Sequence, residues 1–375
     1  FIIVFYPTAL EYLKSYIIKD IKYIAYDPNY DVKIKYLIVS VLYLPKIIID
    51  NFYILKEVNL IKFLKIIKLY FVCNAITLNI LNLKPRAVLT YVDNSPIFHI
   101  VSRQCHNIPF LAIQNGNRES FALSEELIHP SHKYYINEYF CFGPKTQDTF
   151  LKYKQYNITE YFFCGSLKEG IFFENNYDKV LSNACTFDIC LISEWQPDEH
   201  ILYKTNSFKN HKISIEKTCL LLAKFIKEKK LSLVISCKSL NENEENFYRK
   251  YFNDSAVFRY RKKNELDNYA TSCSSNVTVA IYSALAREMI GAGLKVLFVN
   301  PYGDNNFKVT NKDCDWYIHV PDYSQFSKRL SILLEKENVK FFKENEDDIK
   351  YINSFRPEMP MHKIIRESIL NKIKL

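Results

Sequence analysis

Short apolar runs alternate with helix-length amphipathic segments along the whole chain. This alternation is typical of βα units, in which parallel strands form a sheet and helices cover its faces. In the first half, the pattern predicts a long helical region at residues 36–81 and strands at residues 2–5, 87–91, 110–114, 139–141 and 161–164.

A second series of the same kind follows a polar, weakly patterned stretch at residues 167–184. The predicted strands are 188–192, 231–235, 256–259, 277–281 and 296–299, and the predicted helices are 215–229, 264–270, 282–291, 324–335 and 361–374. The length of 375 residues suits two domains of about 150–200 residues each. We therefore expect an α/β protein with two Rossmann-like domains that face a central cleft. The expected boundaries are residues 1–170, a linker at 171–186, residues 187–358 and a terminal segment at 359–375.

Charge changes this picture only near the beginning of the chain. The net charge is +9, and in residues 61–70 lysine alternates with Ile, Leu and Tyr. Amphipathic helices with solvated lysines explain this pattern best, and an anionic membrane surface or a nucleic acid are the alternative partners. Nucleic acid is disfavoured because no recognised reader motif occurs. Residues 36–55 come nearest to a membrane span, but Pro45, Lys46 and Asp50 interrupt them, so we expect a buried or interfacial helix.

Several chemistries lack their usual motifs. The ten cysteines show neither a CxxC pair nor the Cys/His spacing of a zinc site, which fits a reducing cytoplasm. A Walker A loop, a GxGxxG and a GxSxG are all missing from the sequence, which disfavours kinases, dehydrogenases and α/β-hydrolases. We expect the adjacent pair Asp347 and Asp348 to lie on a solvated helix face and not to bind a metal. We expect a metal-independent mechanism without a cofactor.

The segment at residues 280–300 carries the clearest candidate chemistry. A helix is predicted to open at Tyr282 and Ser283 between two apolar strands. The free N–H groups and the dipole of a helix N-terminus favour an anion such as phosphate. Glu288 follows Ser283 by five residues, or roughly one and a half turns, so it can approach the same ligand. A phosphate seat with a nearby carboxylate indicates a nucleotide, although Ser283 could simply cap the helix and Glu288 could be exposed.

Other strand ends of the second half supply candidate cations. Lys238 and Ser239 follow one predicted strand, and Arg261 follows the next. In an open parallel sheet these positions face the ligand crevice, so the three side chains could contact a phosphate or line a nucleotide pocket. Lys238 as a solvated loop charge and Arg261 as a surface ion-pair partner are the structural alternatives.

Two strand ends stand out in the first half. Asp93 and Asn94 follow one strand, with His99 shortly after them. Asp93 is the first candidate for the base that removes a proton from an acceptor hydroxyl, and His99 is the second. For His99, a hydrogen-bonded histidine on a helix that follows Pro96 is favoured over a catalytic role.

The next strand of the first half ends in a tight turn that contains Asn115 and Gly116. Glu119 follows as the third candidate base. Arg118 and Arg103 are candidate anion binders, because the guanidinium fork fits a carboxylate or a phosphate.

These segments resemble bacterial surface-carbohydrate (O-antigen or capsule) biosynthesis proteins of the GT-B glycosyltransferase type. The resemblance rests on residues 93–99, on the turn at residues 113–118 and on residues 282–300. Similar proteins often carry His-Gly where this chain has Asn115-Gly116, which shifts the catalytic assignment toward Asp93. The resemblance implies a donor nucleotide on the C-terminal domain, an acceptor on the N-terminal one, and a terminal helix that packs back on the first domain.

The function implied is an inverting transfer of a sugar from a nucleotide-sugar co-substrate to a glycan or glycolipid acceptor. The protein would act in the cytoplasm, at the inner face of the cytoplasmic membrane. A polyol-phosphate transferase, a sugar-nucleotide epimerase and a non-catalytic scaffold for polysaccharide assembly are the alternatives on the same fold.

Overall fold

A computed structural model describes residues 1–56, 58–118, 134–152, 156–174, 176–182, 185–197, 210–238, 240–261, 266–312 and 314–374. The chain forms two compact units. The first comprises Phe1–Leu167 with Met359–Leu375, and the second comprises Lys168–Glu358. Residues 171–186, which we expected to form a linker, belong to the second unit and contain the end of α7 (Leu167–Phe173) and α8 (Tyr177–Ser182).

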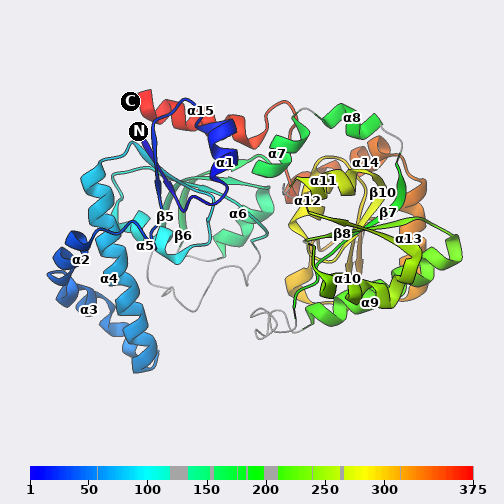
Figure 1. Ribbon diagram of the computed structural model, residues 1–375, viewed down its shortest axis with the longest axis horizontal. Helices are drawn as coiled ribbons and strands as arrows, with labels where there is room; N and C mark the ends of the chain where they lie inside the picture. Colours follow the sequence, from blue (N-terminus) through cyan, green and yellow to red (C-terminus); the bar gives the residue numbers. More distant parts are fainter. Residues whose placement is uncertain are drawn as a thin grey trace. The chain divides into compact units, whose positions relative to one another are not determined.

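The first unit is built on a six-stranded parallel sheet with the order β2-β1-β3-β4-β5-β6 (Figure 1). Its strands are β1 (Ile2–Phe5), β2 (Tyr23–Tyr26), β3 (Ala87–Thr90), β4 (Phe110–Ile113), β5 (Tyr134–Cys141) and β6 (Tyr156–Phe163). The apolar pattern predicted every one of these strands except β2. That strand pairs only with β1 at the edge of the sheet, and its Ala25 is exposed, so it lacks the apolar run of a buried strand.

Helices cover both faces of this sheet. Apolar side chains of α4 (Leu60–Leu83) and α5 (Pro96–Gln104) join Phe5, Val88 and Phe110 in one core. On the opposite face, α15 (Met361–Lys374) contacts β3, and its Arg366 donates to the carbonyl oxygen of Ile17 in the π-helical segment Leu13–Ile17. In the sequence, that segment directly follows the short α1 (Leu10–Tyr12), and α6 (Pro144–Leu151) connects β5 to β6.

The helical region predicted at residues 36–81 is divided. It comprises α2 (Ile34–Val41), α3 (Leu44–Asn51), a 3₁₀ segment (Phe52–Lys56) and α4, and Pro45 stands in the first turn of α3, where its missing N–H costs nothing. By length and composition α4 could cross a membrane. A helix in the core of a globular unit passes the same test, and half of the apolar stretch of α4 is buried within the unit.

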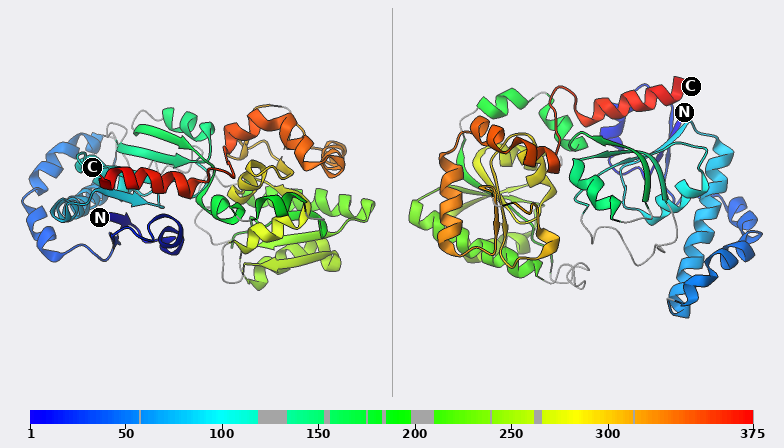
Figure 2. Two further views of the ribbon diagram at one scale, coloured as in Figure 1. Left: turned by 90° about the horizontal axis from the view of Figure 1, so that it is seen from above. Right: turned by 180° about the vertical axis from the view of Figure 1, so that it is seen from behind.

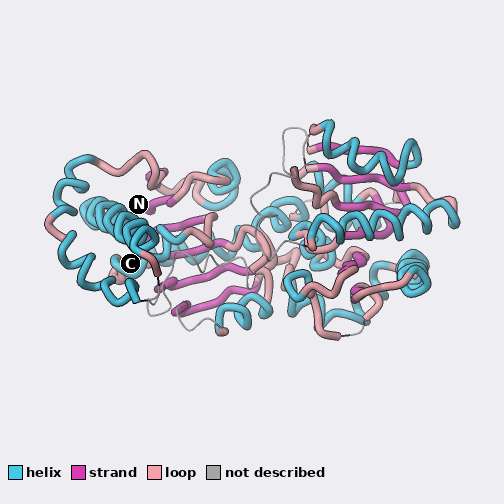
Figure 3. Tube along the Cα trace, turned by 90° about the horizontal axis from the view of Figure 1, so that it is seen from below, coloured by secondary structure: helices cyan, strands magenta, loops and turns pink. Residues whose placement is uncertain are grey.

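The second unit repeats the architecture. Its parallel sheet has the order β12-β11-β10-β7-β8-β9. The strands are β7 (Phe187–Ile192), β8 (Leu233–Cys237), β9 (Ala256–Tyr260), β10 (Ser275–Ala280), β11 (Val296–Asn300) and β12 (Tyr317–His319). The helix α9 (His211–Lys229) contacts α10 (Glu242–Phe252) and α13 (Tyr323–Glu335). In the same way, α12 (Ala284–Gly291) contacts α11 (Asp267–Cys273) and α14 (Asn338–Ile352). Figure 1 labels these helices, and Figures 2 and 3 show helices on both sides of the strands of this unit. The predicted α/β architecture with two parallel sheets is confirmed.

The strand order locates one ligand crevice in each sheet. In the second unit the chain runs from β7 outward to β9 and then returns to place β10 on the other side of β7. In the first unit β2 and β3 flank β1 in the same way. Loops at the carboxyl ends of the two central strands diverge at such a switch point, which is where open α/β sheets bind ligands.

Candidate functional site

The switch point of the second unit is occupied by the carboxylate of Glu194. Glu194 follows β7, and the N–H groups that open α12 follow β10. The carboxylate accepts hydrogen bonds from the N–H of Ile281 at 2.7 Å, of Tyr282 at 2.9 Å and of Ser283 at 3.2 Å. The N-terminus of α12 does bind an anion, as an unsatisfied helix start should. The anion is a side chain of the same chain, so the expected phosphate seat is already filled.

His211 completes the surroundings of this carboxylate. Its Nε2 lies 3.5 Å from the Glu194 Oε2, and both side chains are buried. Burial alone would raise the pKa of Glu194. The hydrogen bond from His211 and those from Tyr282 and Ile281 outweigh burial, so the pKa is held below its ordinary value and the group is ionised at neutral pH.

Ser283 and Tyr282 stand where the sequence predicted them, but in different roles. Ser283 is the N-cap residue of α12, and its side chain makes no capping hydrogen bond. The hydroxyl of this partly exposed residue is therefore not used for capping. The Tyr282 ring is buried between Phe307, at 5.6 Å between ring centroids, and the guanidinium of Arg287, at 5.1 Å.

Lys238 extends the cluster from the end of β8. Its Nζ donates to the carbonyl oxygen of Trp195 at 3.3 Å, and its N–H donates to Glu244 at 3.2 Å. Glu244 also accepts a hydrogen bond from the Ser193 hydroxyl. Burial lowers the pKa of Lys238, while the carboxylates of Glu194 and Glu244 oppose that shift. Lys238 is therefore a half-buried cation at the switch point and not a solvated loop charge.

The structure also describes two other donor-side candidates, Glu288 and Arg261. Glu288 is buried and accepts a hydrogen bond from the Tyr269 hydroxyl at 2.6 Å, so it is not the exposed helix residue of the alternative interpretation. Arg261 is exposed after β9. Ser239 lies outside the described residues. At the end of α12, Gly291 is required because a Cβ there would stand 2.5 Å from the side chain of Asn353.

A groove of about 470 Å³ opens at the same edge of the second unit. Its lining includes Trp195 after β7, Asn241 after β8, and Phe247 and Tyr251 on α10. Aromatic faces and amide groups are common in sites that bind sugars or bases.

In the first unit, Asp93 and Arg118 form a buried ion pair. Arg118 donates to the Asp93 carboxylate through Nε at 2.7 Å and also through Nη2. The Tyr139 hydroxyl donates to the same carboxylate at 2.5 Å, and the N–H of Asn115 donates at 3.3 Å. The Asp93 side chain has no exposed surface. Four donors and complete burial leave it unsuited to accept a proton from an acceptor, so the geometry argues against Asp93 as the base.

His99 is equally enclosed. Its Nε2 lies 2.7 Å from the backbone carbonyl oxygen of Asp93, which can only accept, so this nitrogen carries the proton. Burial lowers the pKa of His99 to about 4, so the imidazole is neutral at pH 7. His99 is a hydrogen-bonded core histidine, as the alternative interpretation held. Glu119, the third candidate base, lies outside the described residues.

The turn that follows β4 is organised by Gln114, which the sequence did not single out. Its amide donates to the carbonyl oxygen of Gly116 at 2.7 Å and accepts from the N–H of Phe142 and the hydroxyl of Thr146, both at 3.0 Å. Asn115 is exposed, and its Oδ1 accepts from Arg118 at 2.5 Å. Asn94 is also exposed. The turn and the Asp93 loop thus lie together, as expected for neighbouring strand ends.

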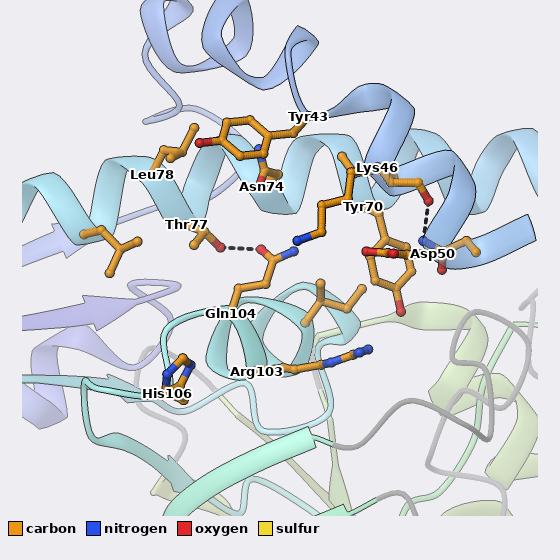
Figure 4. A pocket seen from close by; sticks show the side chains of 14 residues that line it. Tyr43, Lys46, Asp50, Tyr70, Asn74, Thr77, Leu78, Arg103, Gln104 and His106 are labelled. Carbon is orange, nitrogen blue, oxygen red and sulfur yellow. Dashed lines mark hydrogen bonds between the residues drawn. The ribbon is translucent and has the colours of Figure 1, made fainter.

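Arg103 does not join this cluster. It lies in the last turn of α5 and lines a separate groove of about 460 Å³ with Lys46 of α3 and Tyr70 and Asn74 of α4 (Figure 4).

Among the described residues, no group of three or more His, Cys, Asp and Glu side chains is placed to hold a metal ion. The sequence contains one Asp-x-Asp triplet, Asp313-Cys314-Asp315, which was not among the predicted site residues. Such a triplet is a candidate metal ligand. Asp315 pairs with Arg329 at 2.8 Å and Lys336 at 2.9 Å, and Asp313 lies outside the described residues.

Comparison with known proteins connects this architecture to a family. A family model described as "putative O-antigen biosynthesis protein" matches residues 111–321, which is more than half of the chain. The chain belongs to this family. No curated protein sequence matches it.

Solved structures share the architecture at low sequence identity. The UDP-GlcNAc 2-epimerase from Neisseria meningitidis, bound to UDP-GlcNAc, is 12% identical with a TM-score of 0.50, and the match covers 99% of each chain. A glycosyltransferase from Rickettsia africae is also 12% identical with a TM-score of 0.50, over 99% of this chain and 89% of that one. The protein therefore has a GT-B-like fold, which both epimerases and glycosyltransferases use.

Proposed function

We propose that the protein is a nucleotide-sugar-dependent glycosyltransferase of O-antigen assembly, with its donor at the carboxyl edge of the second unit's sheet. The convergence of three strand ends at one switch point carries this proposal: Glu194 after β7, Lys238 after β8 and the turn at Tyr282 and Ser283 after β10. Ligands of open parallel sheets bind at such a point. Membership of an O-antigen family supports a surface glycan as the product.

Glu194 decides how the donor would be held. Because its carboxylate occupies the N–H groups of Ile281, Tyr282 and Ser283, we assign the donor phosphates to the ammonium of Lys238 and the hydroxyl of Ser283. A cation at that position stabilises the charge that develops on the departing phosphate. Glu288 is buried against the Tyr269 hydroxyl, so we assign it to the packing of α12 on α11 and not to contact with the donor.

The acceptor would be a glycan or glycolipid bound at the exposed Asn94 and Asn115 of the first unit. Asp93 and Arg118 then act by fixing the turn that carries Asn115. An acceptor hydroxyl that displaces the nucleotide in line inverts the anomeric carbon. The new bond from its oxygen forms as the bond from that carbon to the phosphate oxygen breaks, and the hydroxyl proton passes to the departing phosphate. This step requires neither a metal nor an enzyme nucleophile.

The same Glu194 favours a second candidate function, a non-catalytic family member that serves as a scaffold. In this chain the carboxylate of Glu194 already accepts hydrogen bonds from the N–H groups that would otherwise be available to a phosphate.

Thermal-shift and calorimetric titration with CMP, UDP, GDP, CDP and their sugar conjugates separates these functions. A glycosyltransferase raises its melting temperature with one nucleotide class, and binding weakens in Lys238→Met. Loss of every response would support the scaffold. Conversion of the bound sugar without an acceptor, followed by NMR, would support an epimerase, and transfer of a polyol phosphate would support that enzyme class.

A further inference from the structure

An exposed apolar surface lies on the helical layer of the first unit formed by α2, α3 and the beginning of α4. Twelve exposed large apolar side chains lie between Ile34 and Leu64, whereas the rest of the described chain has fourteen. Leu42 is 78% exposed, Ile49 71% and Ile61 69%. Such a concentration on a globular unit marks an interaction site.

The apolar positions follow the helical period, so they form outward faces. On α2 they are Ile34, Ile38, Val39 and Val41, followed by the C-cap residue Leu42, opposite the buried Tyr36 and Ser40. On α4 they are Leu60, Ile61 and Leu64, opposite the buried Phe63, Ile66 and Ile67. These helices pack together, α2 and α3 meet at a bend of 63°, and Figures 1 and 2 show them with the start of α4 at one side of the first unit.

Lysines stand among these apolar side chains. Lys35 lies beside Ile38 and Val39 on α2, and Lys65 and Lys68 continue the stripe of Ile61 and Leu64 on α4; all three lysines are exposed. The segment from Asp31 to Lys68 contains seven lysines and only three acidic residues, so it carries a net positive charge. An outward helix face that mixes large apolar residues with lysines matches a lipid surface with anionic headgroups.

We propose that α2, α3 and the first turns of α4 dock the protein on an anionic bilayer. The apolar side chains enter the interface between headgroups and acyl chains, and the lysines contact the lipid phosphates. A second copy of the chain fits less well, because a symmetric contact through this face would bring Lys35, Lys65 and Lys68 toward one another. The docking surface does not depend on the proposed transferase activity and can be tested without a donor.

The test is co-sedimentation of the full chain with vesicles of phosphatidylglycerol and phosphatidylethanolamine, compared with pure phosphatidylcholine. We expect binding to the anionic vesicles that weakens with salt. The triple variant Lys35→Gln/Lys65→Gln/Lys68→Gln should bind about a hundredfold more weakly, at about fivefold per lysine. Its control is Lys227→Gln/Lys229→Gln/Lys340→Gln, which removes exposed lysines of the second unit and should bind like the wild type.

A second pair of variants tests the apolar part. Leu42→Gln/Ile61→Gln/Leu64→Gln changes residues that are at least 57% exposed, so the fold should persist, and vesicle binding should fall by more than a hundredfold. The control is Leu220→Gln/Leu240→Gln/Val339→Gln, which are similarly exposed. Equal binding to both vesicle types, or equal binding by test and control variants, would overturn the proposal. So would a stable dimer in sedimentation equilibrium that the apolar variant converts to monomers without any wild-type vesicle binding.

Discussion

The carboxylate of Glu194 accepts a hydrogen bond from the N–H of Tyr282 at 2.9 Å, although the two residues are 88 positions apart in the chain. This contact joins the end of β7 to the start of α12 across the switch point of the second sheet. The N–H groups at the start of α12, where the sequence predicted a phosphate, are thus bound by a carboxylate of the protein itself.

Replacement of this carboxylate should therefore destabilise the second unit. Glu194→Gln presents only one accepting oxygen to three N–H groups, and we expect a loss of about 2–3 kcal/mol in the free energy of unfolding at pH 7. The folded-state pKa of Glu194 is lowered, so its contribution is present above the unfolded pKa and is lost as the pH falls through the folded value. Denaturant titrations at pH 7 and pH 3 should thus show a gap between wild type and variant that narrows in acid. A gap that widens in acid would contradict the assignment.

Asp93→Asn should affect stability before it affects any reaction. The substitution leaves Arg118 buried without its counter-charge, which costs about 3–5 kcal/mol. Arg249→Gln is a suitable comparison, because it breaks a partly exposed pair with Glu245 and should cost about 1 kcal/mol or less. Chemical denaturation measures both. An Asp93→Asn variant as stable as the wild type would restore Asp93 as a candidate base.

His99 should make the first unit sensitive to mild acid. Its folded-state pKa of about 4 lies below the ordinary value of 6.5. Above pH 6.5 the imidazole is neutral in both the folded and the unfolded state, so His99 does not change the free energy of unfolding. As the pH drops from 6.5 toward 4, only the unfolded state takes up the proton, and stability falls. One proton taken up on unfolding corresponds to about 1.4 kcal/mol per pH unit in that window. His99→Gln should flatten this part of the profile, whereas replacement of the exposed His106 should not. Identical profiles for wild type and His99→Gln would show that the histidine titrates normally.

Ser95 and Ser283 both stand at the start of a helix, but only Ser95 caps its helix, so we expect their substitutions to have different effects. The Ser95 hydroxyl caps α5 by accepting from the N–H of Phe98 at 3.4 Å, so Ser95→Ala should cost about 1 kcal/mol. Ser283 makes no such bond, so Ser283→Ala should change stability by less than about 0.5 kcal/mol while nucleotide affinity falls. A large loss of stability in Ser283→Ala would instead assign that hydroxyl to the fold.

The sequence predicted the sheets well because their central strands are continuous apolar runs between polar turns. It missed β2, an edge strand with an exposed Ala25, and the three-residue edge strand β12. It also missed α10 and α14, which are rich in charged residues although their few apolar side chains share one buried face. The sequence also predicted which polar residues follow the strands, but not which side chains they would bind. Nothing in residues 93–118 shows that Asp93 is enclosed by Arg118 and Tyr139, and nothing near residue 194 shows that its carboxylate reaches residue 282. Such pairings depend on the packing of distant segments.

The proposed donor site at Lys238 and Ser283 is tested most directly by nucleotide release. Each nucleotide sugar is incubated with the full chain and a glycolipid acceptor extract, and free nucleotide is measured over time. The proposal predicts release from one donor class, at least tenfold slower in Lys238→Met and unchanged in the control Lys227→Met. Because the pKa of Lys238 is lowered, release should also decline at a lower alkaline pH than an ordinary lysine would give. No release from any donor, or equal rates in wild type and Lys238→Met, would contradict it.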